Sequence, residues 1–370
     1  MAVRRKRVLL NAMHATTGGG LTYLRGILPE LAKDERFTWT LLAPQAALAG
    51  WELPEGVTVK VAPELNFWKG HLWEQLWLPV LATKWGMQAV LCNANYVPLM
   101  ASKPMPIIHT TPRAAGQAQT RGMKLYWKVL KLLTTLSVWN APVAFSVAKH
   151  VIPDYVGPWM AKKVRVASPA IGHEEVGGDA VKDPNLVVTV GDFYAQKDYP
   201  LLVQALKVLR EKRPASRLMI IGRPVDARVR NEVLALIREL KLADAVTLTG
   251  GMPHDKLMQA LARASVYVST SKAECFNIPV LEAMASGVPC VLGDTPFQRE
   301  VAGETAVYVP VDKGGEIAAA FAVAMFGLLE NQSLAGTLRA AGLKRAANYT
   351  WVATARVIAD GVAAAFGMRS

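Results

Sequence analysis

The chain has 370 residues, a net charge of +13 at pH 7 and a hydrophobic content of 52%. A chain of this length exceeds what one hydrophobic core usually serves, so we expect two domains. No stretch offers about 20 predominantly apolar residues free of charges and strong polar groups, and we therefore predict no transmembrane helix.

The N-terminus and the cysteines indicate a cytoplasmic protein. The basic residues 4–7 are followed by only a short apolar run without a small-residue cleavage site, which is typical of a first strand and not of a signal peptide. Cys92, Cys275 and Cys290 have no metal-ligand spacing, so we predict no metal site and a reducing compartment.

Positive charge is concentrated in the first half of the chain. Residues 1–175 contain 20 Lys and Arg against 10 Asp and Glu, a net charge of +10, whereas the remainder contains 22 against 19, or +3. Such asymmetry indicates a polyanionic partner, which is nucleic acid, an anionic membrane surface or an anionic substrate.

Short apolar, β-branched runs separated by helical or loop stretches predict a doubly wound first domain. The first strand is expected at residues 6–13, followed by a loop at 16–20 and by a helix that begins at Leu21. Further strands are expected at residues 37–42, 57–61, 89–92, 106–109, 143–145 and 164–167.

Residues 67–79 are rich in tryptophan and predict a helix with Trp73 and Trp77 one turn apart. Sugar faces stack on indole rings, and Glu74 and Gln75 offer groups that bind hydroxyls, so Trp73 is a candidate acceptor contact. Core packing is the alternative, because aromatic residues at this spacing often anchor a helix in a core.

Residues 121–133 predict a basic amphipathic helix. Lys124, Lys128 and Lys131 recur at three- and four-residue spacing, and apolar and aromatic residues flank them. This pattern fits the headgroups of an anionic membrane surface. An ordinary surface helix with solvated lysines is the alternative.

A second α/β domain follows a linker at residues 168–178, a segment poor in large apolar residues. We expect a strand at 186–191, a loop that contains Lys197, and a helix at 200–209. A further strand at 246–250 and a helix at 254–264 continue the pattern, residues 294–300 are expected to form a loop, and 306–310 a last strand before the final helices.

The most informative stretch runs from Glu274 to Pro289. Apolar runs at 264–270 and 289–293 flank it, which predicts a strand, a loop, a short helix and a strand. Glu274 is expected in the loop after a strand and Glu282 in the first turn of the helix, with both carboxylates facing one crevice. Such crevices bind ligands, and the free N–H groups of a helix start attract phosphate.

The pattern E-x-F-x-x-P-x-L-E-A-M-A-x-G-x-P in this stretch resembles the signature of the retaining, nucleotide-sugar-dependent glycosyltransferases of family 4, also called group 1. The resemblance implies the GT-B fold, with two Rossmann-like domains facing across a cleft. Residues 1–170 would form the acceptor-binding domain and 171–350 the nucleotide-sugar-binding domain. Residues 351–370 would form a helix that crosses back to the first domain.

The resemblance also implies roles for individual residues. Glu282 would bind the ribose, Glu274 the donor sugar and Lys197 the diphosphate. His109 would lie near the donor sugar, with a buried structural histidine as the alternative. Arg113 is a candidate contact to the acceptor or a phosphate. The remaining donor contacts would come from two glycines and from the helix start: Gly19, Gly20, Asn277, Ile278, Pro279 and Val280.

The sequence departs from the family pattern at three positions. The family usually has glycine where Cys275 and Asn277 stand, and arginine where Asp192 stands. A carboxylate at the last position opposes a leaving diphosphate, which needs fixed cations and hydrogen-bond donors. We expect Arg223 to supply the missing charge from the neighbouring strand end. A slow enzyme and a different mode of donor binding are the alternatives.

The resemblance thus implies retaining transfer of a hexose from a UDP- or GDP-linked donor to a glycan or to a lipid-linked, lipopolysaccharide-type acceptor. The leaving phosphate would take the proton, and neither a cofactor nor a metal ion is expected. We expect the enzyme to be peripheral on the inner face of the cytoplasmic membrane. A nucleotide-sugar epimerase of the same fold and a non-enzymatic polyanion-binding protein are alternatives, although the sequence shows no nucleic-acid motif.

Overall fold

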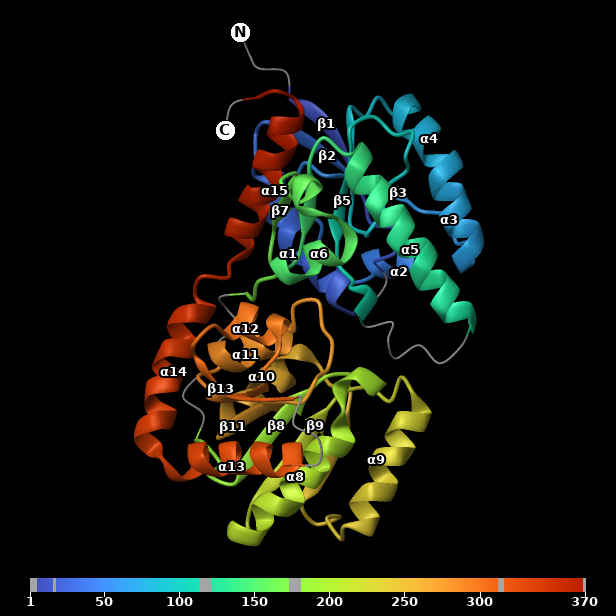
Figure 1. The fold of residues 1–370 in the computed structure, drawn as a ribbon. Coiled ribbons are helices and arrows are strands. Elements are labelled where there is room, and N and C mark those ends of the chain that lie inside the picture. Colours follow the sequence, from blue (N-terminus) through green and yellow to red (C-terminus); the bar gives the residue numbers. More distant parts are fainter. Residues whose placement is uncertain (1–4, 16–17, 114–120, 173–180, 312–315, 369–370) are drawn as a thin grey trace. The chain divides into compact units, whose positions relative to one another are not determined.

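The computed structural model describes residues 5–15, 18–113, 121–172, 181–311 and 316–368 (Figure 1). Residue 4 of the basic N-terminal run and residues 173–178 of the expected linker lie outside these ranges. The chain divides into two compact units. Unit 1 comprises Met1–Ala170 and Thr350–Ser370, and unit 2 comprises Ile171–Tyr349.

Unit 1 is built on a seven-stranded sheet in which every paired strand is parallel, with the order β3-β2-β1-β4-β5-β6-β7. The order reverses between β1 and β4, as in doubly wound folds. The prediction of such a sheet is confirmed. The strands are β1 (Lys6–Asn11), β2 (Phe37–Ala43), β3 (Thr58–Val61), β4 (Ala89–Cys92), β5 (Pro104–Ile108), β6 (Ala144–Ser146) and β7 (Val164–Val166).

Helices connect these strands. They are α1 (Gly18–Ala32), α2 (Gln45–Leu48), α3 (Phe67–Leu76), α4 (Leu78–Lys84), α5 (Arg121–Asn140), α6 (Ile152–Tyr155), α7 (Pro158–Ala161) and α15 (Trp351–Ala365). The boundary that differs at candidate site residues is the start of α1: the helix begins at Gly18, so Gly19 and Gly20 lie in its first turn and not in a loop. Glycine is a poor helix former, and the triplet therefore gave no helix signal.

The C-terminal helix α15 packs against α1 within unit 1. Thr350 caps it by accepting a hydrogen bond from the backbone N–H of Ala353 at 3.1 Å. The ring of Trp351 lies so close to Gly26 of α1 that a Cβ there would come within 2.2 Å of an indole atom. The last helix thus returns to the first domain, as the GT-B fold requires.

Unit 2 contains a six-stranded parallel sheet with the order β10-β9-β8-β11-β12-β13. Its strands are β8 (Leu186–Val190), β9 (Arg217–Ile221), β10 (Val246–Gly250), β11 (Val266–Ser269), β12 (Cys290–Gly293) and β13 (Ala306–Val309). Its helices are α8 (Tyr199–Lys212), α9 (Ala227–Glu239), α10 (His254–Arg263), α11 (Ile278–Ala285), α12 (Pro296–Ala302), α13 (Ile317–Glu330) and α14 (Gln332–Ala346). The core of this unit is made mainly of aliphatic residues together with Phe193, Tyr199 and Phe321.

Two predictions in unit 2 were wrong in detail. Residues 294–300, expected as a loop, contain the start of α12, whose cap is the hydroxyl of Thr295 and whose first residue is Pro296. Both are ordinary start signals, but the helix is too short to show a periodic apolar face. Glu282 lies in the second turn of α11 and not in the first, because the helix begins at Ile278.

Within the ranges that the structure describes, no single helix has both the length and the apolar composition needed to cross a bilayer. The pair formed by Ile317–Glu330 and Gln332–Ala365 meets these criteria only when its two parts are taken together, and it is sharply bent.

Candidate functional site

In unit 2, two of the predicted site residues meet at the carboxyl ends of adjacent strands. Strands β8 and β11 pair in parallel, so the loops that follow them emerge side by side. The first loop carries Lys197 and the second Glu274, and Lys197 Nζ lies 2.6 Å from Glu274 Oε1. Both side chains are largely buried, with exposed fractions of 12% and 17%. The structure therefore brings a cation and a carboxylate together where parallel sheets bind ligands.

Two backbone features hold Lys197 in this place. The hydroxyl of Thr270 donates a hydrogen bond to the carbonyl of Lys197 at 2.8 Å. A Cβ on Gly191 would lie 2.6 Å from Lys197 Cε and 2.8 Å from Nζ. The Lys197 side chain therefore packs directly against Gly191, and any larger residue at position 191 would collide with it.

Arg223, the expected substitute cation, forms an ion pair with Asp192. Arg223 Nη2 lies 2.5 Å from Asp192 Oδ2, and the backbone N–H of Arg223 donates to Oδ1 at 2.8 Å. Burial alone would raise the pKa of the Asp192 carboxyl, but the hydrogen bonds and charge of Arg223 outweigh it and lower that pKa. Asp192 is thus ionised at neutral pH and balances the charge of Arg223.

Glu282 is nearly buried on α11, and its Oε1 lies 3.8 Å from Nδ1 of His254 at the start of α10. His254 was not among the predicted site residues, because nothing but its place after the turn that follows β10 distinguishes it in the sequence. Burial raises the pKa of the Tyr267 hydroxyl, and the charges of Glu282 and Glu274 raise it further. Both carboxylates therefore lie near the same residue of β11.

Asn277 occupies the N-cap of α11 in a left-handed conformation, with φ 62° and ψ 61°. Glycine adopts this region without strain, which explains why glycine suits the position and why asparagine is tolerated there. The side chain points inward, because its amide donates to Ser269 Oγ at 3.3 Å and to Gln298 Oε1 at 3.1 Å. Among the predicted donor contacts, Asn277 can therefore contribute backbone and not its amide.

In unit 1, His109 lies at the end of β5 in a hydrogen-bonded setting. Its Nε2 lies 2.6 Å from Asn93 Oδ1, and its backbone N–H donates to Asn95 Oδ1 at 2.8 Å. The amide nitrogen of Asn93 donates to the carbonyl of Gly20 at 3.0 Å, so Oδ1 is the acceptor and Nε2 carries the proton. Burial lowers the pKa of His109 to about 4, and the ring is therefore neutral at pH 7.

The two other candidate contacts in unit 1 are engaged within the protein. Arg113 Nε donates to Asp154 Oδ1 at 2.8 Å, although the arginine side chain remains 54% exposed. Trp73 packs against a hydrophobic cluster that includes Met13 and Leu78. The core-packing alternative for Trp73 therefore fits the structure better than a sugar contact.

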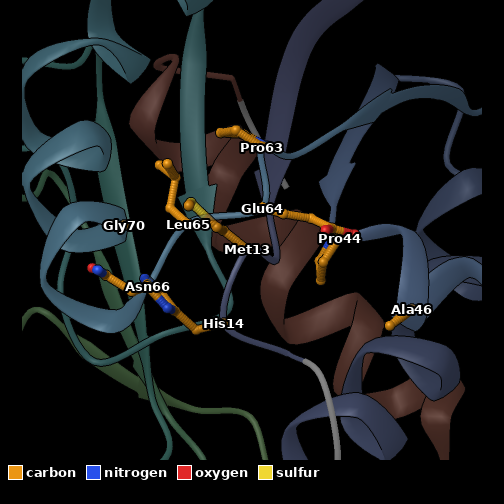
Figure 2. Close-up of a pocket in the computed structure, with 9 residues that line it drawn as sticks. All are labelled: Met13, His14, Pro44, Ala46, Pro63, Glu64, Leu65, Asn66 and Gly70. Atoms are coloured by element: carbon orange, nitrogen blue, oxygen red, sulfur yellow. The ribbon is translucent and has the colours of Figure 1, made fainter.

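A cavity of about 440 Å³ in unit 1 was not predicted (Figure 2). Its wall comes from the segments that directly follow β1, β2 and β3, which is the end of the sheet at which ligands bind. The lining residues are Met13, His14, Pro44, Ala46, Pro63, Glu64, Leu65, Asn66 and Gly70. Most of these residues closely follow predicted strands, and this placement could have indicated a ligand cavity from the sequence.

A polar cluster borders this cavity at His14. Its other members are Tyr96, which follows β4, and two residues of α3, His71 and the fully buried Glu74. Burial, followed by the charge of His14, lowers the pKa of His71. The prediction that Glu74 binds substrate hydroxyls is not supported, since its carboxylate is bonded to Asn11, His14 and Tyr96.

The predicted basic amphipathic helix is α5, and it is longer than expected. Lys124, Lys128 and Lys131 are all exposed. Large apolar side chains at three- and four-residue spacing are exposed as well: Leu125, Val129, Leu132, Leu136 and Trp139. A helix of a soluble unit normally buries such a stripe.

Comparisons with known proteins agree with this fold. Residues 175–345 match the family model described as glycosyl transferases group 1. Mannosylfructose-phosphate synthase from Agrobacterium fabrum is 27% identical over 180 residues, which cover 46% of this chain and 38% of that enzyme. The match thus spans well under half of the relative's length.

Solved structures match over nearly the whole chain. Sucrose-phosphate synthase from Thermosynechococcus elongatus has a TM-score of 0.81 at 18% identity, covering 98% of this chain and 100% of that one. HepE of Anabaena in complex with UDP-glucose has a TM-score of 0.73 at 16% identity, covering 97% and 99%. At such identities these structures show the fold alone. Residues 175–345, which make up most of unit 2, therefore match the group 1 glycosyltransferases, and the solved structures show that the chain has the GT-B fold.

Proposed function

We propose that this protein transfers a hexose from a UDP- or GDP-linked donor to a hydroxyl of a glycan or of a lipid-linked, lipopolysaccharide-type acceptor. The observation that carries the proposal is the meeting of Lys197 and Glu274 at the ends of β8 and β11, with Glu282 on the helix that follows. The complex of HepE, which shares this fold, with UDP-glucose supports a nucleotide-sugar donor.

The donor would bind in unit 2 through residues with distinct roles. Glu282 would accept hydrogen bonds from the ribose hydroxyls, and Glu274 from hydroxyls of the donor sugar. Lys197 and the start of α11 would hold the diphosphate, since a helix start and a cation both favour negative charge. The ion pair with Glu274 keeps the lysine in position before the donor arrives, so little reorganisation is needed on binding.

The transfer would proceed with retention of the anomeric configuration. As the bond to the diphosphate breaks, negative charge on the leaving group is stabilised by Lys197 and by the N–H groups of α11. The acceptor hydroxyl attacks from the same face, and its proton passes to the leaving phosphate. Donor handling therefore relies on protein groups and not on a metal ion. Neutral His109 would contribute through Nδ1, which can accept a hydrogen bond from a sugar hydroxyl.

The first test is calorimetric titration of the protein with UDP, GDP, ADP and their common hexose conjugates. Preferential binding of one nucleotide by the wild type, with loss of binding in Glu282→Ala, is the expected result. Asp255→Ala is the control, because Asp255 is an exposed carboxylate on the neighbouring α10. Binding of none of these nucleotides would contradict the proposal.

An epimerase would use the same donor site without an acceptor. Incubation of the preferred donor alone, followed by NMR of the sugar, separates the two reactions. Recovery of an altered nucleotide sugar would favour the epimerase, whereas the transferase leaves the donor unchanged apart from slow hydrolysis.

We further propose that the enzyme is peripheral on the cytoplasmic face of an anionic membrane, and that α5 is the contact. Its exposed leucines, Val129 and Trp139 suit the boundary between headgroups and acyl chains, and the adjacent lysines suit anionic lipid. Unit 1 also exposes Trp68, Leu72 and Leu76 on α3, one turn apart along the helix. A membrane position fits a lipid-linked acceptor.

A further inference from the structure

Four polar side chains from three separate segments of unit 1 converge beside the cavity. His14 Nε2 lies 2.8 Å from Glu74 Oε2. The hydroxyl of Tyr96 lies 2.8 Å from His14 Nε2, 2.8 Å from Glu74 Oε2 and 2.6 Å from His71 Nδ1. One hydroxyl oxygen thus touches both imidazoles and the carboxylate, which means that all three point at one place.

We propose that His14, His71 and Glu74 form a binding site for a divalent transition-metal ion, with Zn²⁺ as the best match. One ligand atom from each residue lies within 4.8 Å of the other two. Two imidazole nitrogens and one carboxylate oxygen form a ligand set typical of zinc, which prefers nitrogen, sulfur and oxygen ligands in a tetrahedral arrangement. The Tyr96 oxygen stands in the fourth position.

Only a small adjustment is needed to hold an ion. Zinc bonds to nitrogen and oxygen are about 2.0–2.1 Å long, so the ligand atoms of a tetrahedral site are about 3.3 Å apart. The bonded pairs in the cluster are 2.6–2.8 Å apart. These hydrogen-bonded pairs would have to lengthen by roughly 0.5–0.7 Å, and the ligand atoms of His14, His71 and Glu74 all lie within 4.8 Å of one another.

Charge also favours a cation at this place. Glu74 has an exposed fraction of 0%, and a buried carboxylate is costly unless a positive charge compensates it. Within the described ranges, the ion-pair partner found for Glu74 is His14, which is charged only when protonated. A divalent ion would supply that charge while leaving both imidazoles neutral, the form in which they bind metals.

The surroundings meet two further requirements of a metal site. The side-chain amide of Asn11 donates to Glu74 Oε1, so the carboxylate oxygen that does not face the cluster is oriented by a second residue. His14 also lines the cavity, which offers a route for the ion. The proposed sugar transfer uses no metal ion, so this inference goes beyond it.

The test is equilibrium dialysis of the full chain against ZnCl₂ after treatment with a chelator, followed by elemental analysis. The wild type should retain about one equivalent and His150→Ala the same, because His150 is a histidine of unit 1 outside the cluster. His71→Ala and Glu74→Gln should bind zinc more than about tenfold more weakly. Co²⁺ in place of Zn²⁺ should give the intense visible absorption of a tetrahedral site in the wild type and in His150→Ala, and not in His71→Ala or Glu74→Gln.

Thermal unfolding with and without zinc keeps the proposal testable if a variant folds poorly. Zinc should raise the Tm of the wild type and of His150→Ala but not of His71→Ala, and His14→Gln provides a milder second variant. Retention of zinc by His71→Ala and His14→Gln at the wild-type level would overturn the proposal. So would a wild type that binds no zinc, which would make the cluster a hydrogen-bonded network only. Nucleotide titrations on the same samples report on the donor site independently.

Discussion

Lys197 Nζ lies 2.6 Å from Glu274 Oε1, although the two residues come from loops that are far apart in the sequence. Both side chains are mostly buried, and the opposite charge of each offsets the free-energy cost of removing the other from water. The pair holds a cation at the proposed diphosphate position and a carboxylate at the proposed sugar position. Replacing either residue therefore affects both functions at once.

Lys197→Ala should lower kcat by about 10²–10³, the usual loss when one preorganised stabilising group is removed from a developing anion. Lys272→Ala is the matched control, because Lys272 is exposed and pairs with Asp198 at 2.7 Å in the same loop region. Steady-state kinetics with the preferred donor measure both variants. Equal kcat values for the two would show that Lys197 does not contact the diphosphate.

The ion pair of Asp192 and Arg223 predicts that a substitution of Asp192 increases the affinity for a nucleotide diphosphate. Asp192→Asn should free the arginine and tighten nucleotide diphosphate binding by about 0.5–1 kcal/mol, or twofold to fivefold, since the pair is partly exposed. Arg223→Ala added to Asp192→Asn should cancel the gain. Titration of the wild type, the single variant and the double variant with the nucleotide diphosphate measures these affinities. If the double variant keeps the gain, Arg223 is not its source.

His109 predicts a pH dependence of stability. Its pKa is about 4 in the folded chain and near 6.5 when exposed, so the folded state favours the neutral ring. The contribution of the neutral ring to the free energy of unfolding is complete above pH 6.5 and is lost as the pH falls towards 4. Urea unfolding at pH 7 and pH 4.5 should therefore show a larger loss for the wild type than for His109→Asn. Carboxylates titrate in both the wild type and the variant, so the difference between the two losses of stability reports the contribution of His109.

Gly222 should tolerate no side chain. A Cβ there would lie 1.8 Å from the carbonyl oxygen of Gly191, a backbone atom that cannot move aside without disturbing the ends of β8 and β9. Gly222→Ala should lower the free energy of unfolding by ~1–3 kcal/mol or more. Gly327→Ala is the contrasting variant, since Gly327 lies inside α13 with open space around it and should gain ~0.4–1 kcal/mol. Denaturant unfolding measures both.

The α5 surface predicts binding to anionic vesicles. Replacing Lys124, Lys128 and Lys131 by glutamine should weaken binding to phosphatidylglycerol-containing vesicles by about 100-fold, at ~1 kcal/mol per lysine. Leu125→Ser with Leu132→Ser should abolish binding, whereas Val323→Ser, an equally exposed apolar residue of α13, should not. Sedimentation with vesicles measures this binding. A dimer of the wild type that the α5 serines dissociate would assign the apolar stripe to a second copy of the chain instead.

Much of unit 2 could be predicted from sequence because its elements are short, regular and punctuated. The strand, short helix and strand expected around the stretch from Glu274 to Pro289 are present as β11, α11 and β12. The placement of Glu274 beside Lys197 could not be derived in this way, because it depends on β8 and β11 being neighbours in the sheet. Strand order is a property of tertiary packing.

Other features depended on side-chain directions that a sequence does not carry. Asn277 stands at the helix start as expected, but its amide turns into the core towards Ser269 and Gln298. Glu74 was recognised as polar within an apolar segment, yet its partners come from loops after β1 and β4. These contacts join residues distant in the chain, and no local pattern reports them.

The discontinuity of unit 1 has a consequence for synthesis on the ribosome. Unit 2 is one continuous segment, Ile171–Tyr349, whereas unit 1 needs both Met1–Ala170 and Thr350–Ser370. Domains usually fold in the order in which they emerge. Here the space against Gly26 stays unfilled until Trp351 has left the exit tunnel, after unit 2 is already complete. The surface of unit 1 that α15 later covers therefore stays exposed for most of translation. We expect chaperones that bind apolar surfaces to recognise it during that time.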